Sequence, residues 1–146
     1  MNQTYLKWLK SAGVIQLITG CFHSLSLIAP TVANNEKEKQ LVDLMTTYRF
    51  DLGAGFHPSM DNLMTSFSIS FSLLLFFSGT INLILVKSKL SDLFMRKIIG
   101  ANLITYILCF VAMSLLTFLP PIVCIGLIAG ALLVAYLKIP NPTTGA

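Results

Sequence analysis

Four long stretches of this chain contain no charged side chain, and each is rich in apolar residues. At a rise of about 1.5 Å per residue, three of them are long enough to cross a hydrocarbon core of about 30 Å as α-helices, and the fourth is marginal. The pattern predicts an all-α membrane protein, a single domain of residues 1–146 that forms an antiparallel bundle of four transmembrane helices. The predicted spans are residues 11–29, 63–86, 98–119 and 121–137.

The loop between the first two spans, residues 30–62, carries a helical pattern of its own. Asn35 followed by Glu38 resembles a capping box, which satisfies free N–H groups at the start of a helix. Apolar residues then recur on one face, which predicts an amphipathic helix over residues 36–48 that lies on the membrane surface or covers the bundle as a lid. These apolar residues are Leu41, Leu44, Met45 and Tyr48.

Glycine and proline mark the remaining boundaries. The segment 53–55, with two glycines, ends the loop helix, and Pro58 with Ser59 opens the next helix near the start of the second span. Pro120 and Pro121 separate the last two spans as a loop, which predicts a tight hairpin.

Composition supports the membrane assignment. Apolar residues make up 55% of the chain and charged residues only 11%, against roughly 25% charged in ordinary soluble domains. Topology explains the formal net charge of +4 better than nucleic-acid binding does, because Lys and Arg accumulate in cytoplasmic loops. Both termini are therefore predicted in the cytoplasm. The basic residues on that side are Lys7, Lys10, Lys87, Lys89, Arg96, Lys97 and Lys138.

A different interpretation of the first span stays open. Two lysines, an apolar run and small residues at 31–33 also resemble a secretory signal, and residues 18–21 resemble a lipoprotein box. The apolar stretch continues well past Cys21, which favours a retained span. A mature N-terminus at Cys21 or Asn34 would contradict the four-helix prediction.

Three amide side chains fall at one depth within the predicted spans. Asn82 lies ten residues before Asp92 in a cytoplasmic turn, and Asn102 lies ten residues after it. Gln16, about five residues into the first span, falls near the same level. We therefore predict an amide cluster in the cytoplasmic third of the bundle. It acts either as structural glue between helices or as a polar track for an ion or small solute.

A second group of polar residues falls toward the outer side. His23 is the only histidine in a predicted span, and ionisable groups inside membranes are candidates for function by default. Ser70 and Ser114 fall at comparable depth, which predicts a small outward-facing polar pocket. His57 and Asp61 are four residues apart and meet if the second helix begins by His57. The predicted ligand-binding residues are His23, Arg49, His57, Asp61, Ser70 and Ser114.

Small residues indicate how the helices pack. Gly126 and Gly130 form a Gly-x-x-x-Gly pair in the fourth span, which predicts close packing within one bundle, with dimerisation as the alternative. A second stripe, predicted to face protein, lies in the first span and consists of Gly13, Gln16, Gly20 and His23.

Known membrane chemistries find little support in the sequence. One histidine in a span does not supply two facing haem ligands, and His23, His57 and Asp61 come from different depths, which argues against zinc. No predicted span carries Asp, Glu, Lys or Arg, and neither a G-x-S-x-G motif nor a P-loop is present. We therefore expect no catalytic residue, metal or cofactor, and an enzyme is the less favoured class.

The first two spans and their loop carry a family resemblance through Ser59-Met60-Asp61, the run 67–73, Gly79, Asn82-Leu83, Gly20 and His23. On these residues, the region 13–85 resembles a family of small uncharacterised four-helix bacterial membrane proteins, a domain of unknown function. The last two spans match only in being apolar. The resemblance implies a multi-pass protein of the bacterial cytoplasmic (inner) membrane and implies nothing about mechanism.

The expected function is that of a small polytopic membrane protein with a structural, accessory or interaction role. Its expected partners are membrane lipids and either further copies in a homo-oligomer or a larger membrane complex, without nucleic acid. The alternative is a binder or carrier of a lipid, quinone or other small apolar molecule in an outward-facing cavity. A cavity lined by His23 and Ser70 would favour the alternative.

Overall fold

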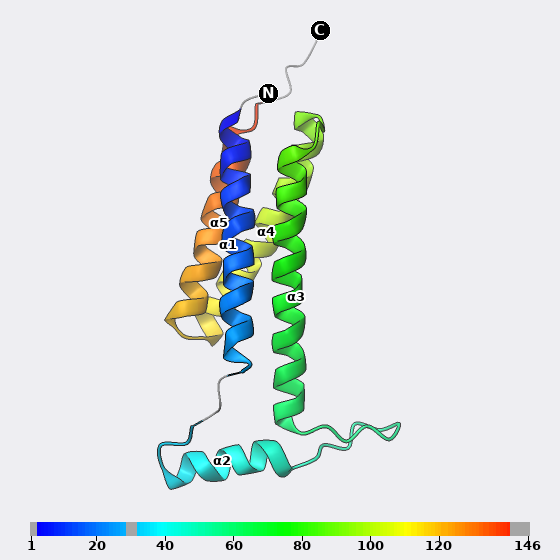
Figure 1. Ribbon diagram of the computed structural model, residues 1–146, viewed down its shortest axis with the longest axis vertical. Coiled ribbons are helices and arrows are strands. Elements are labelled where there is room, and N and C mark those ends of the chain that lie inside the picture. Colours follow the sequence, from blue (N-terminus) through cyan, green and yellow to red (C-terminus); the bar gives the residue numbers. More distant parts are fainter. Residues whose placement is uncertain (1–2, 29–31, 141–146) are drawn as a thin grey trace. The chain divides into compact units, whose positions relative to one another are not determined.

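A computed structural model describes residues 3–28 and 32–140, which form five helices and no strand (Figure 1). These residues divide into two compact units, one joining the chain up to Thr19 with the chain from Leu75 onward, and the other comprising Gly20–Leu74. The helices are α1 (Gln3–Ser26), α2 (Glu36–Thr47), α3 (Met60–Lys87), α4 (Asp92–Leu116) and α5 (Leu119–Lys138).

Three of the helices, α3, α4 and α5, are long and apolar enough to cross a membrane. Within the described residues α1 does not reach the same hydropathy, because Lys10, Gln16 and His23 interrupt its apolar sequence. The predicted all-helical class is therefore confirmed for the described residues, and three helices fit a membrane protein, while the fourth crossing stays a prediction. The predicted junction between the first span and the loop, Ala29 with Pro30, lies outside the described residues.

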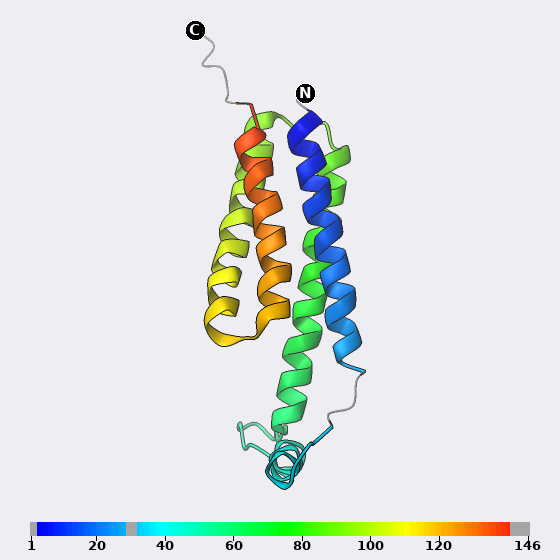
Figure 2. The ribbon, with the colours of Figure 1, turned by 90° about the vertical axis from the view of Figure 1, so that its left-hand side faces the viewer.

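Helices α4 and α5 lie side by side as an antiparallel hairpin in the first unit (Figure 2). The turn between them is only Thr117 and Phe118, and Pro120 and Pro121 belong to the first turn of α5. The prediction that these prolines form the loop is wrong. Proline fits the first turn because the N–H groups there have no partner within the helix.

The core of the first unit is apolar, and so is much of its outer surface. Tyr5 and Leu9 of α1, Ile99 of α4, and Ile128 and Leu132 of α5 are completely buried. On the outside of this unit, where water would not favour them but lipid would, large apolar side chains are more numerous than in its core. Examples are Phe77, Ile104, Leu108, Leu115, Leu127 and Leu137.

The second unit contains the predicted loop helix, α2, which begins with the predicted capping box. Glu38 N–H donates to Asn35 Oδ1 at 2.9 Å, and Asn35 Nδ2 donates to Glu38 Oε1 at 2.9 Å. Asn34 N–H adds a bond of 2.7 Å to Glu38 Oε2. The helix ends at Thr47, one residue before the predicted boundary.

A tight loop connects α2 to α3. Phe50 N–H donates to Pro58 O at 3.0 Å, which closes the base of the loop. At its tip Gly53, Ala54 and Gly55 have φ of 78°, 50° and 81°, a left-handed conformation that glycine adopts without steric cost. Helix α3 then begins at Met60. Its first turn is capped by Ser59, whose Oγ accepts a hydrogen bond from Asn62 N–H at 3.1 Å.

Candidate functional site

A chain of amide side chains links three helices in the first unit. Asn102 Nδ2 of α4 donates a hydrogen bond of 2.9 Å to Asn82 Oδ1 of α3. Asn82 Nδ2 in turn donates one of 2.8 Å to Gln16 Oε1 of α1. Gln16 and Asn82 have no exposed surface, so both amides depend on protein partners for their hydrogen bonds.

The register of the α3–α4 turn explains why the two asparagines meet. Asn82 and Asn102 each lie ten residues from Asp92, the first residue of α4. Two antiparallel helices joined by a turn rise by the same step per residue. Residues at the same number of positions from that turn, one on each helix, therefore lie at the same height. The structure thus brings together the three amides that the sequence placed at one depth.

A second polar pair lies one turn further along the same two helices. Ser78 Oγ of α3 and Tyr106 Oη of α4 are 2.7 Å apart and share a hydrogen bond, and Tyr106 also interacts with the Gln16 side chain. Sequence reasoning missed this pair although the signal was present. Ser78 lies fourteen residues before Asp92 and Tyr106 fourteen after it, so the rule that pairs the asparagines also pairs these residues.

These five side chains form what we call the amide network. Amides and hydroxyls are neutral near pH 7, so the network supplies hydrogen bonds and no charged group. Gln16 Nε2 is buried and does not meet the geometry of a hydrogen bond to any described residue. These side chains can therefore hold helices together by hydrogen bonds. The buried donor Gln16 Nε2 could also bond a polar solute. The members are Gln16, Ser78, Asn82, Asn102 and Tyr106.

A close backbone crossing holds Gln16 beside Asn82. A Cβ added to Gly13 would lie 3.0 Å from Gly79 O, and one added to Gly79 would lie 2.9 Å from Gly13 O. Gln16 follows Gly13 by three residues, and Asn82 follows Gly79 by three. Because the absence of side chains lets the two antiparallel backbones approach, the side chains of Gln16 and Asn82 bridge the short gap between the helices beside this crossing.

At the start of α1, Tyr5 is tied to the start of α4. Tyr5 Oη donates a hydrogen bond of 2.9 Å to Asp92 Oδ1. Burial, then the hydrogen bond and the charge of Asp92, raise the pKa of Tyr5 to about 12. Tyr5 is therefore a protonated donor at any physiological pH, and this bond spans 87 residues of sequence.

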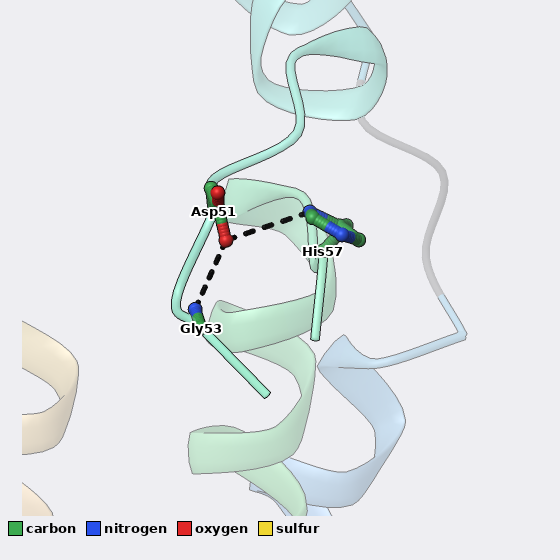
Figure 3. A network of polar contacts seen from close by, with 3 residues as sticks. All are labelled: Asp51, Gly53 and His57. Atoms are coloured by element: carbon green, nitrogen blue, oxygen red, sulfur yellow. Dashed lines mark hydrogen bonds and ion pairs between the residues drawn. The ribbon is translucent and has the colours of Figure 1, made fainter. Parts of the chain in front are cut away.

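In the second unit, the predicted ligand-binding residue His57 has a partner that was not predicted. Figure 3 shows Asp51 between Gly53 and His57: Gly53 N–H donates to Asp51 Oδ1 at 3.0 Å, and His57 Nδ1 lies 3.9 Å from the same oxygen. His57 faces Asp51 in place of the predicted Asp61, because α3 begins only at Met60 and His57 lies outside the helix.

His23 and Arg49 also have neighbours outside the predicted ligand-binding set. The half-buried His23 ring meets Phe71 edge to face, with ring centroids 5.1 Å apart. Arg49 Nη1 donates to Asn62 Oδ1 at 2.8 Å. Asp61 lies exposed in the first turn of α3, where the helix dipole favours a negative charge.

The two serines of the predicted pocket bond within their own helices. Ser70 Oγ donates to Ser66 O at 2.9 Å, and Ser114 Oγ donates to Phe110 O at 2.8 Å. Both serines are exposed. Hydroxyls that bond one turn back are a common way to satisfy serine in an apolar helix, so these contacts do not support the predicted outward-facing polar pocket.

The predicted glycine pair of α5 has two different environments. A Cβ on Gly126 would lie 3.0 Å from Phe110 Cε2, so Gly126 makes room for an aromatic ring of α4 in the same chain. A Cβ on Gly130 would meet no described atom within 4 Å. The first glycine therefore serves packing within the chain, and the second does not.

An apolar groove of about 350 Å³ lies in the second unit, between α2 and the first residue of α3. The Tyr48 and Phe50 rings stack edge to face beside it, with centroids 5.0 Å apart. Within the described chain its lining includes none of the predicted ligand-binding residues and all four residues of the apolar face predicted for the loop helix. The lining residues are Leu41, Leu44, Met45, Tyr48, Phe50 and Met60.

Comparisons with protein-family models, with curated proteins and with solved structures found no match.

Proposed function

We propose that the protein is a small multi-pass membrane protein with a structural or accessory role, in which the amide network fastens α1, α3 and α4 together. The buried chain from Gln16 through Asn82 to Asn102 carries this proposal. Apolar packing alone gives little free-energy preference for one register between membrane helices, because lipid tails are as apolar as leucine. Directed hydrogen bonds, at about 0.6 kcal/mol each on average, supply that choice.

The proposal includes α1 as a fourth membrane crossing. The charge-free part of α1, residues 11–26, extends about 24 Å as a helix, and the long side chain of Lys10 can reach the cytoplasmic surface from within a hydrocarbon core of about 30 Å. Two features support the crossing: Gly13 packs backbone to backbone on α3, and Gln16 has its amide partner there. These contacts offset part of the lower hydropathy of α1, because they remove the Gln16 amide from lipid.

The proposed location is the bacterial cytoplasmic (inner) membrane, with both termini in the cytoplasm. The basic residues next to the spans support this orientation. Fusions of green fluorescent protein, which fluoresces only when it folds in the cytoplasm, test it at each end. Fluorescence from both fusions is expected, and a dark N-terminal fusion beside a bright C-terminal one would contradict four crossings.

The role of the amide network is tested with Asn82→Leu and Asn102→Leu. We expect the detergent-purified variants to lose a single sharp elution peak and to unfold at lower temperature. The matched control is Thr105→Leu, since Thr105 is exposed on α4 and its hydroxyl bonds Ala101 O of its own helix. An intact fold with a changed solute flux into proteoliposomes would instead favour the polar-track interpretation.

An accessory role also requires a partner, and we propose either further copies of the chain or a larger membrane complex. The exposed apolar side chains of α4 and α5 leave room for such contacts. Native mass spectrometry of protein released from mild detergent reports the oligomeric state and any bound lipid in one measurement. A bare monomer, seen reproducibly, would count against this part of the proposal.

A further inference from the structure

The apolar face of α2 is left largely uncovered by the described chain. Leu41 and Leu44 are 56% and 59% exposed although both line the apolar groove. They belong to one stripe along the helix, at steps of four and three residues. Exposed apolar stripes on short helices next to a membrane are typical of segments that lie in the lipid interface.

The length of α3 places the groove at the level of the lipid headgroups. With 28 residues, α3 is about 42 Å long, about 12 Å more than the hydrocarbon core. The two headgroup layers together occupy about 10–15 Å, so both ends of α3 reach them. Met60 is the first residue of α3 and lines the groove, which fixes the depth of the groove.

The direction of α2 agrees with this depth. In Figure 1, α2 runs crosswise to the first turns of α3, and in Figure 2 it is seen end-on while α3 stands upright. Both segments belong to the unit Gly20–Leu74. A helix that lies crosswise to a membrane-crossing helix runs parallel to the membrane plane, so its apolar stripe can contact lipid along its whole length.

The charged residues around α2 also favour contact with phospholipid. Lys37 precedes Leu41 by four residues and thus lies on the same face of α2. Arg49 directly follows Tyr48, which lines the groove, and its guanidinium also bonds Asn62 Oδ1. Glu36 and Asp43 occupy a different face of the helix. Glu38 lies on the face of the stripe, where Asn34 and Asn35 bond its carboxylate in the capping box. Cations beside an apolar stripe suit a phospholipid, whose phosphate lies directly above its acyl chains.

We infer that the groove and the apolar stripe of α2 form a phospholipid-binding surface, which takes acyl chains in the groove and phosphates beside Lys37 and Arg49. The inference rests on the proposed membrane topology. Lipid covers this face of α2, in place of the helical bundle of the same chain or a second copy of the chain.

Tryptophan quenching by brominated lipid tests the inference in the full-length chain. The single tryptophan, Trp8, is first replaced by Phe, and reporters are then introduced singly as Leu44→Trp, Thr46→Trp and Phe77→Trp in proteoliposomes. Leu44 lies on the apolar stripe, and exposed Thr46 lies on the opposite face of the same helix. Phe77 is 66% exposed in the middle part of α3.

The expected result is that phosphatidylcholine brominated near the glycerol end of its chains quenches Leu44→Trp at least about twofold more than Thr46→Trp. Lipid brominated near the methyl end should quench Phe77→Trp most strongly. Equal quenching of the two α2 reporters, with Phe77→Trp quenched normally, overturns the phospholipid surface alone. An unquenched Phe77→Trp overturns the membrane topology as well.

Discussion

Gly13 and Gly79 face each other so closely that each occupies the space that a side chain on the other would need. The carbonyl oxygen of either residue lies about 3 Å from the Cβ position of its partner, at 3.0 Å and 2.9 Å. Leu83 and Leu17 close the same contact from the two sides, each within 3.1 Å of the facing Cβ position. This crossing decides how near α1 comes to α3.

Replacing either glycine with alanine should therefore weaken the bundle. We expect Gly13→Ala and Gly79→Ala each to lower the free energy of unfolding by about 1–3 kcal/mol, the usual cost of overpacking. The obstructing atom is a backbone oxygen, which has little freedom to move. Circular dichroism in detergent during denaturation measures the effect.

Gly130→Ala is the matched control for this prediction, because a Cβ there meets no described atom within 4 Å. It should leave stability unchanged or raise it by up to about 1 kcal/mol through helix propensity. Equal losses at all three positions would show that the crossing has no special tightness.

Asn82 should be energetically coupled to Gln16. Asn82 is the middle member of the amide chain, so Asn82→Leu removes two hydrogen bonds and leaves Gln16 Oε1 without its donor. In a double-mutant cycle with Gln16→Leu, we expect a coupling of about 0.6 kcal/mol, and no more than about 1.7 kcal/mol, the range measured between membrane helices. Additive effects of the two substitutions would contradict a direct contact.

Tyr5→Phe should destabilise the protein by about 1–2 kcal/mol, through loss of the buried hydrogen bond to Asp92. A raised folded-state pKa means that the stability contributed by Tyr5 is complete below its ordinary pKa of 10.0 and is lost as the pH rises toward about 12. Ultraviolet titration should show one tyrosine component near pH 12 that Tyr5→Phe removes. Asp92→Asn should move that component downward but not to 10.0, because burial of Tyr5 remains.

Acid should weaken the capping box at the start of α2. The backbone N–H of Asn34 is the largest of the causes that hold the pKa of Glu38 below its ordinary value of 4.5. A lowered folded-state pKa means that the stabilisation is complete above pH 4.5 and is lost as the pH falls through the lower value. Nuclear magnetic resonance of the Glu38 carboxyl carbon during a pH titration measures the midpoint.

Two variants of Asn34 separate the donors in this box. Asn34→Pro removes the backbone N–H together with the side-chain amide and should raise the Glu38 midpoint most. Asn34→Ala removes only the side-chain bond of 3.0 Å and should raise it less. The difference between the two shifts measures the backbone bond, and a difference smaller than the shift of Asn34→Ala would show that the backbone bond is not the main cause.

Much of the helical layout follows from sequence. The charge-free stretches locate α3, α4 and α5 because a charged side chain has a high free energy in the lipid interior and a low one at the membrane surface. The Asn35–Glu38 box and the apolar periodicity locate α2 to within one residue at its C-terminal end, since both are local patterns. Equal spacing about Asp92 predicts the level of the asparagines, and a wider use of the same rule would also have found Ser78 with Tyr106.

Only the tertiary structure decided which side chains those levels bring into contact. The Gly13–Gly79 crossing sets the distance between the helices at which Gln16 bonds Asn82. The Phe110 ring fills the space beside Gly126, whereas no described atom lies within 4 Å of a Cβ on Gly130. His57 turned to Asp51 because a loop bonded from Phe50 to Pro58 delays the start of α3. Depth in a membrane is a property of position along one helix, and sequence determines it; contact depends on the distance and rotation between two helices, which packing alone sets.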